Sequence, residues 1–126
     1  MKPFVSICIP VFKTEQFLEE ALQSVASQTF KQIEIILVND ASSQTNENGL
    51  SCKEIVTQFK KKNKIKITYI EHSKNKGLVE ARRTALYEAK GEYVFFFDSD
   101  ALLTPNAIQD LVYFAQTEKS DIVQGG

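Results

Sequence analysis

Several features that would assign this chain to a class at once are scarce or missing. Its 126 residues include two cysteines and one histidine, and the formal net charge of the chain is −1. The spacing of Cys8 and Cys52 fits neither a disulfide framework nor a metal motif, so we expect a reducing compartment. A nearly neutral chain also gives no electrostatic reason to bind nucleic acid. Secreted disulfide-rich and nucleic-acid-binding classes are therefore disfavoured.

Long hydrophobic runs are missing as well. No apolar stretch approaches the ~20 residues that cross a bilayer. The first residues, Met1-Lys2-Pro3, lead straight into a strand-like segment, so we expect no signal peptide. With 43% hydrophobic residues, the chain can still bury a core. We expect a cytoplasmic protein with a single domain over residues 1–126.

Familiar nucleotide motifs and catalytic pairs do not occur. No G-x-G-x-x-G follows the first predicted strand, and no G-x-x-x-x-G-K-[ST] is present. Dinucleotide and P-loop sites therefore lack sequence support. His72 is alone in a polar loop, and no Ser–His or Cys–His constellation can be assembled around it. We expect His72 to be structural or solvated and not catalytic.

The most informative stretch present is Tyr93–Phe97 with the residues that follow it. Five large apolar residues without alternation predict a strand covered on both faces, as in a parallel sheet. Asp98 and Asp100 come directly after it, where open α/β sheets bind their ligands. Paired carboxylates suit Mg²⁺ or Mn²⁺. The alternative is that the two carboxylates merely begin a solvated loop.

Strands and helices alternate along the chain. Strands are predicted at Val5–Val11, Ile33–Val38, Ile65–Ile70 and Tyr93–Phe97, and Asp121–Val123 begins another. Helices lie between them, with Thr14, Ser51 and Thr104-Pro105 as N-terminal caps. Their apolar stripes comprise Phe17, Leu18, Ala21, Leu22 and Val25; Ile55, Val56 and Phe59; Leu78, Ala81, Ala85, Leu86 and Ala89; and Ala107, Ile108, Leu111, Val112 and Ala115. This order predicts a Rossmann-like α/β/α sandwich with a mostly parallel sheet, and the alternating third strand is expected near an edge.

In such a sheet, every strand has its carboxyl end at the same edge. The loops at 10–13, 39–42, 72–77 and 98–100 should therefore form one cleft. Its acidic candidates are Asp40, Asp98, Asp100 and Glu15, and its basic candidates are Lys13, Lys76, Arg82 and Arg83. Acidic and basic groups in one pocket suit a metal-bound phosphorylated ligand, and Gly77 would let the backbone approach it.

A cluster of lysines follows the second predicted helix. It comprises Lys60, Lys61, Lys62, Lys64 and Lys66. Cations near a helix C-terminus interact favourably with the helix dipole, so a solvated helix end is the default interpretation. The alternative is attraction to anionic lipid headgroups, which would place the protein peripherally at the inner face of the membrane.

Several motifs together resemble a known family. They are V-S-I-C-I-P-V-F at Val5–Phe12 with Glu15 and Leu18, S-V-A-S-Q-T at Ser24–Thr29, E-I-I-L-V-N-D-A-S at Glu34–Ser42, N-K-G at Asn75–Gly77, Ala81-Arg82, and G-E-Y-V-F-F-F-D-S-D at Gly91–Asp100. The set resembles family 2 glycosyltransferases with the GT-A fold, of nucleotide-diphospho-sugar transferase type, over essentially the whole chain. Each motif alone is weak evidence, whereas the combination is highly specific.

The resemblance implies metal-assisted transfer of a sugar, with inversion, from a nucleotide-diphosphate sugar to the hydroxyl of a saccharide or lipid-linked acceptor. We expect a UDP-sugar as the donor and Mg²⁺ or Mn²⁺ as the cofactor. By family likeness, Asp40 contacts the base, Glu15 lies close to the nucleoside, and Arg82 lies near the phosphates. Asp98 and Asp100 hold the ribose and the metal-bridged diphosphate. The remaining expected donor-binding residues are Pro10, Val11, Phe12, Ser42, Lys76, Gly77 and Ser99.

The chain departs from the family pattern at several positions. Lys13 replaces a usual Asn, Asn39 and Gln44 replace Asp residues, Arg83 replaces a frequent Asn, and Ala101 replaces an acidic residue. The retained acidic residues support nucleotide binding, whereas the replacements leave the donor preference open.

Length separates this chain from the family. The catalytic domain of the family runs to roughly twice this length. We therefore expect a truncated, donor-binding half, inactive alone, with the general base beyond residue 126. An exposed sheet edge would favour self-association, so a homodimer is an expected partner. The alternatives are a non-catalytic domain of the same fold and a flavodoxin-like phosphoacceptor domain. The phosphoacceptor would need acidic residues after the first strand, where this chain has Pro10, Val11 and Phe12.

Overall fold

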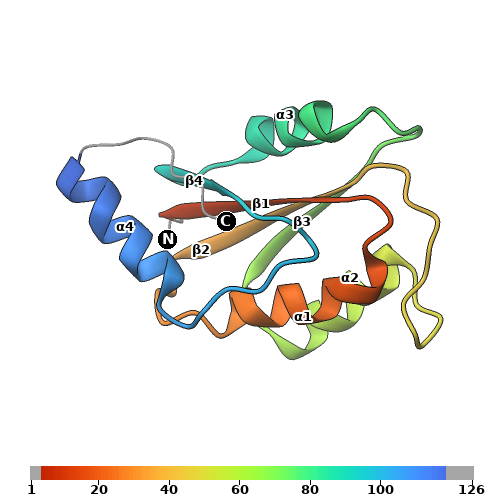
Figure 1. Cartoon of the computed structure of the whole chain (residues 1–126), viewed down its shortest axis with the longest axis horizontal. Coiled ribbons are helices and arrows are strands. Elements are labelled where there is room, and N and C mark those ends of the chain that lie inside the picture. Colours follow the sequence, from red (N-terminus) through yellow and green to blue (C-terminus); the bar gives the residue numbers. More distant parts are fainter. Residues whose placement is uncertain (1–3, 119–126) are drawn as a thin grey trace.

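The computed structural model describes residues 4–118, which form a four-stranded parallel sheet with helices on both faces (Figure 1). The elements are β1 (Val5–Val11), α1 (Glu15–Ala26), β2 (Ile33–Asn39), α2 (Cys52–Lys62), β3 (Lys66–Glu71), α3 (Leu78–Glu88), β4 (Tyr93–Phe96) and α4 (Ala107–Glu118). The strand order is β3-β2-β1-β4. The predicted α/β sandwich is confirmed, and the strand predicted at Asp121–Val123 lies outside the described residues.

The two faces of the sheet bury different amounts of apolar surface. Alternate residues of β1 and β2, such as Ile7 and Ile35, join a large cluster with α1, α2 and α4. The intervening residues, such as Cys8 and Ile36, join a smaller cluster beneath α3. Because successive side chains of a strand point to opposite faces, both inner strands are buried on both sides.

The outer strands are less covered than the inner ones. β3 lies at one edge of the sheet, as its alternating sequence predicted. β4 lies at the other edge of the described sheet, and its Tyr93, Val94 and Phe96 are only half-buried. The prediction that this strand is covered on both faces was therefore wrong in part. Phe95 and Phe97 face the large cluster, whereas only α3 covers the opposite face.

Each of two helices buries a narrower face than its apolar stripe predicted. In α1, Leu18, Ala21, Leu22 and Val25 are buried, but Phe17 is 44% exposed. A residue one position away on a helix points about 100° away from its neighbour, so Phe17 faces outward.

In α3 only Ala81 and Ala85 are buried, whereas Leu78 and Leu86 are exposed. Small residues let the helix approach the strands closely, which leaves no room for leucines on the packed face. The wider predicted stripe was therefore wrong for this helix.

The predicted helix cap is confirmed for α2 and not for α1. Ser51 and Glu54 form the predicted capping box of α2. Thr14 precedes α1 without capping it through its side chain. Pro105 lies in the turn before α4. In the first turn of that helix, the Ile108 N–H donates to Oε1 of the buried Gln28 side chain at 2.9 Å. No helix within residues 4–118 has the length and apolarity needed to cross a membrane.

Candidate functional site

A cavity of about 360 Å³ opens at the carboxyl edge of the sheet, where the predicted loops converge. It is lined by Pro10, Val11, Phe12, Thr14, Asp40, Asn75, Gly77, Leu78, Ala81, Asp98, Ser99 and Asp100. Asp40 and the Asp98–Asp100 pair therefore face a common space from β2 and β4. Parallel pairing of these strands with β1 explains this, because it aligns their carboxyl ends.

The loop after β1 forms one wall of the cavity. Its backbone turns at Lys13, which has a φ of +60°, a region that L-residues adopt at a cost. The Lys13 N–H donates to Ser42 Oγ at 2.8 Å, which ties this loop to the one after β2. The Lys13 ammonium lies 5.1 Å from the centre of the Phe12 ring. The family's usual Asn at this position tolerates positive φ more readily than Lys does.

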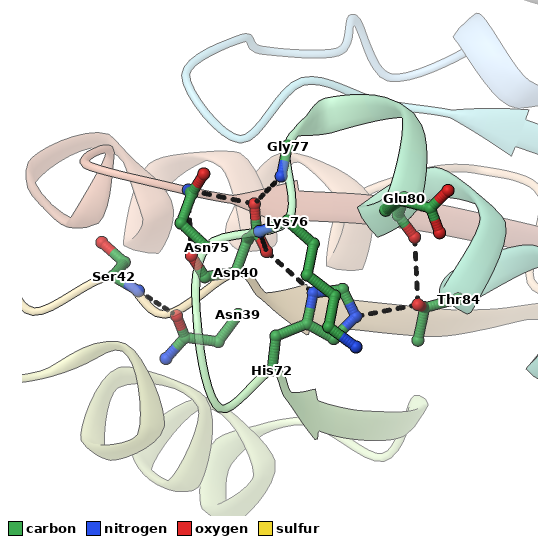
Figure 2. A network of polar contacts seen from close by, with 9 residues as sticks. All are labelled: Asn39, Asp40, Ser42, His72, Asn75, Lys76, Gly77, Glu80 and Thr84. Atoms are coloured by element: carbon green, nitrogen blue, oxygen red, sulfur yellow. Dashed lines mark hydrogen bonds and ion pairs between the residues drawn. The ribbon is translucent and has the colours of Figure 1, made fainter.

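Asp40 is the most densely bonded side chain of the site (Figure 2). Its Oδ1 accepts from His72 Nδ1 at 2.7 Å and from the Lys76 N–H at 2.9 Å. Its Oδ2 accepts from the Gly77 N–H at 2.9 Å and from Asn75 Nδ2 at 3.1 Å. The carboxylate thereby fixes the loop between β3 and α3.

These bonds also set the acidity of Asp40. The residue is 3% exposed, and burial by itself would raise the pKa of its carboxyl group. The hydrogen bond from His72 and those from the Lys76 and Gly77 N–H groups outweigh burial, so the pKa of Asp40 is lowered from its ordinary value. Asp40 therefore presents a charged acceptor at the cavity wall.

The neighbouring Asn39 shapes the loop after β2. Its Oδ1 accepts from the Ser42 N–H at 2.8 Å, and its Nδ2 donates to the Tyr69 hydroxyl at 2.9 Å. Between Asn39 and Ser42, Ala41 adopts a φ of +58°. Asn39 thus supports the turn that carries Asp40 and is not among the residues that line the cavity.

The Asp98-Ser99-Asp100 segment, which follows β4, forms the cavity wall opposite Asp40. Both carboxylates are exposed, whereas Ser99 is buried and its hydroxyl bonds to that of Thr14. This bond ties the segment to the start of α1 and explains why Thr14 does not cap that helix. The two carboxylates are thereby left facing solvent and the cavity.

A cation accompanies this acidic segment. The Arg82 guanidinium lies 4.0 Å from Asp98 Oδ1 and 5.6 Å from the centre of the Phe96 ring. Its Nε is buried without a hydrogen-bond partner among the described residues. Arg82 therefore retains unused donor capacity next to Asp98.

Comparison with known proteins identifies the family. The sequence profile described as "Glycosyl transferase family 2" matches residues 6–126. The chain belongs to glycosyl transferase family 2. The glycosyltransferase GlyG of Streptococcus pneumoniae is 32% identical over 99% of this chain, which spans 39% of the length of GlyG.

Solved structures of family 2 enzymes share the fold. Staphylococcus aureus TarS (residues 1–349, in complex with UDP) superposes with a TM-score of 0.79 at 27% identity over 92% of this chain and 33% of TarS. A mannosyltransferase from Pyrobaculum calidifontis, in complex with GDP-Man and Mn²⁺, superposes with a TM-score of 0.69 at 26% identity over 81% of this chain and 29% of its own. The fold is therefore the GT-A glycosyltransferase fold.

Eight of the site residues expected from the family 2 resemblance line the cavity. They are Pro10, Val11, Phe12, Asp40, Gly77, Asp98, Ser99 and Asp100. Four others, Ser42, Lys76, Arg82 and Glu15, do not line it. Ser42 and Lys76 contribute to the loops through the bonds described above, and the Arg82 guanidinium lies 4.0 Å from Asp98. The carboxylate of Glu15 is buried at the start of α1, with neither oxygen hydrogen-bonded within the described residues. Arg83 pairs with Glu80 on the exposed side of α3.

Four lining residues were not predicted as site residues. Asn75 lies in a loop already assigned to the cleft, and Thr14 directly follows another, so their polar side chains were a usable signal. Leu78 and Ala81 line the cavity because α3 packs closely on the sheet, which no sequence pattern indicated.

The donor set decides which metal would fit. The described residues contain no group of three or more metal-ligating side chains, but Asp98 and Asp100 supply two exposed carboxylates. Mg²⁺ and Mn²⁺ are commonly held by one or two carboxylates, with the remaining positions filled by water and substrate phosphates. The pair therefore fits a metal that binds together with a diphosphate.

Proposed function

We propose that this chain forms the donor-binding part of an inverting glycosyltransferase that uses a UDP-sugar. The sugar would pass to a hydroxyl group of a saccharide or lipid-linked acceptor, in the cytoplasm. The observation that carries the proposal is the shared cavity of Asp40, Asp98 and Asp100. The chain spans 39% of GlyG, so acceptor binding and the general base are assigned to segments outside it.

Base recognition is assigned to Asp40. A uracil ring presents one imide N–H, which requires an acceptor. The Asp40 carboxylate has about four acceptor positions, and all are filled by the donors described above. The longest of these bonds, at 3.1 Å, comes from the Asn75 side chain, which lines the cavity. We infer that the base replaces Asn75 on Oδ2.

The diphosphate is assigned to the opposite wall. Asp98 and Asp100 would hold Mg²⁺ or Mn²⁺, which acts as a Lewis acid on the leaving diphosphate. The unpaired Nε of Arg82 supplies a further donor beside Asp98. The complexes of TarS with UDP and of the Pyrobaculum calidifontis mannosyltransferase with GDP-Man and Mn²⁺ support the binding of a nucleotide donor by this fold.

Calorimetric titration of the chain with UDP, with and without Mn²⁺, tests the proposal. We expect metal-enhanced binding that falls at least tenfold in Asp98→Ala and in Asp100→Ala. Asp110→Ala, an exposed aspartate on α4, is the matched control and should bind as the unmodified chain does. Well-folded protein that binds neither UDP nor other nucleotides under any metal condition would favour the non-catalytic alternative.

A further inference from the structure

His72 is bonded on both sides of its ring, at the junction of three elements (Figure 2). It follows β3, and its Nδ1 lies 2.7 Å from Asp40 Oδ1, at the end of β2. Its Nε2 lies 2.8 Å from Thr84 Oγ1, on α3. The His72 side chain is 6% exposed and is not among the residues that line the cavity. It therefore does not face the space in which a ligand would be held.

We propose that His72 is a positioning residue that orients the Asp40 carboxylate for recognition of the nucleobase. The inference rests on the proposed function, because it assigns to His72 a share of base selectivity at the same site. His72 acts through Asp40 alone and takes no part in the transfer step.

The division of donors between the two Asp40 oxygens supports this role. Oδ1 is held by His72 and by a backbone N–H, neither of which a ligand can displace without moving the loop. Oδ2 is held by the Gly77 N–H and by the Asn75 side chain, and both residues line the cavity. His72 thus anchors the oxygen whose partners, His72 and Lys76, do not line the cavity, and leaves the other oxygen for exchange.

The bonding pattern also fixes the ring. A carboxylate that accepts four hydrogen bonds has no hydrogen to donate, so Nδ1 of His72 must carry the proton of that contact. On the other side of the ring, Thr84 Oγ1 lies 2.8 Å from Nε2 and 3.0 Å from the Glu80 carbonyl oxygen, and its single hydrogen serves one of these two contacts. The imidazole is therefore prevented from rotating by contacts with two elements. Without it, a single backbone N–H would hold Oδ1.

Substitutions at position 72 separate positioning from mere structural support. His72→Leu removes the donor, whereas His72→Asn retains an N–H near the position of Nδ1. We expect His72→Leu to weaken UDP binding at least tenfold and to bring its preference for UDP over CDP close to one. His72→Asn should stay within about threefold of the unmodified chain in both quantities. Lys74→Leu, an exposed change in the same loop, is the matched control.

The chain has one histidine, so nitrogen-15 NMR reports on His72 without assignment by mutation. We expect Nδ1 to be protonated in the ligand-free chain at neutral pH. If His72→Leu is folded, as judged by circular dichroism, and keeps both the UDP affinity and the UDP-over-CDP preference, the inference is wrong. An unprotonated Nδ1 would overturn it as well.

Two outcomes keep the inference separate from the proposed function. If the unmodified chain does not bind UDP, the proposed function fails, while the NMR result still decides the orientation of His72. If His72→Leu does not fold, Thr84→Val decides, because it frees the far side of the ring. We expect this variant to lower the UDP-over-CDP preference in the same direction by about threefold, and an unchanged preference would contradict the inference.

Discussion

Asp40 accepts hydrogen bonds from two backbone N–H groups and two side chains, all within 3.1 Å. A buried carboxylate is stable only when its charge is compensated in this way. The same residue closes the loop before α3 and faces the cavity, so its loss affects both the fold and the ligand site. Two predictions belong to this scale.

The first concerns the acid sensitivity of Asp40. Its pKa in the folded chain is lowered from the ordinary value, so its contribution to stability is fully present above the unfolded pKa of about 3.9. That contribution is lost as the pH falls from there through the folded pKa. We expect Asp40→Asn to cost about 3 kcal/mol near neutral pH and less below pH ~4.

Urea unfolding of both proteins across a pH series measures this difference. Asp110→Asn, at an exposed position, serves as the control, and its free energy of unfolding should differ little from that of the unmodified chain at every pH. A cost of Asp40→Asn that does not change with pH would contradict the assignment.

The second concerns Ala41, whose φ of +58° lies in the left-handed region. This conformation costs an L-residue about 1–2 kcal/mol, whereas glycine adopts it freely but loses about 0.5–1 kcal/mol more in chain entropy. We expect Ala41→Gly to stabilise the chain by roughly 0.5–1 kcal/mol, measured by chemical unfolding. Ala101→Gly is the control: Ala101 does not have a positive φ, so glycine should destabilise there.

At the scale of elements, the junction between α3 and β4 is held by buried polar groups. Glu34 Oε2, on β2, accepts from Ser6 Oγ at 2.6 Å and from the Lys90 N–H at 2.7 Å. Ser6 Oγ in turn accepts from the Gly91 N–H at 2.8 Å. These bonds bring the backbone at Gly91 against β1 and start β4 in register, with Tyr93 beside Val5.

Gly91 is needed at this junction for space. A Cβ at this position would lie 2.8 Å from Ser6 N and 2.9 Å from the Val5 carbonyl carbon. Because backbone atoms cannot move aside without disturbing the sheet, we expect Gly91→Ala to cost about 2–3 kcal/mol in thermal or chemical unfolding.

Gly49→Ala provides the contrast, since its Cβ would meet nothing within 4 Å but its φ of +76° is unfavourable for alanine. Its cost should be about 1 kcal/mol. Equal costs at the two positions would show that the close approach at Gly91 is relieved elsewhere.

At the scale of the whole molecule, the two walls of the cavity come from strands on either side of β1. A ligand that reaches both walls stabilises the sheet as a unit. We expect UDP at about 100 times its dissociation constant, with Mn²⁺, to stabilise the chain by about 2.7 kcal/mol, seen as a higher melting temperature.

Removal of the metal should separate the contributions of the two walls. EDTA should abolish most of the UDP effect, because carboxylates and diphosphate repel each other without a bridging cation. The smaller effect of uridine, which lacks the diphosphate, should remain. A uridine effect that EDTA also abolishes would place the metal at the base and contradict the assignment of Asp98 and Asp100.

Much of this arrangement could be predicted from the sequence. The mainly apolar, β-rich segments at Val5–Val11 and Ile33–Val38 have few alternatives to buried parallel strands, and β1 and β2 are found within one residue of those bounds. The convergence of Asp40 with Asp98 and Asp100 then follows from topology alone. Helix faces were predicted less well, because stripe width depends on how closely a helix packs, as at Leu78 and Leu86.

The amino-acid sequence by itself determined the order of elements, the edge at which the polar loops meet and the acidic residues placed there, since these follow from periodicity and chain direction. Only the tertiary structure decided which side chains face the cavity and which hold its walls. The Thr14 hydroxyl is hydrogen-bonded to that of Ser99, His72 is hydrogen-bonded to Asp40, and Glu34 accepts a hydrogen bond from the Lys90 N–H before β4. These contacts join residues between 32 and 85 positions apart, and no local pattern specifies which distant donor meets which acceptor.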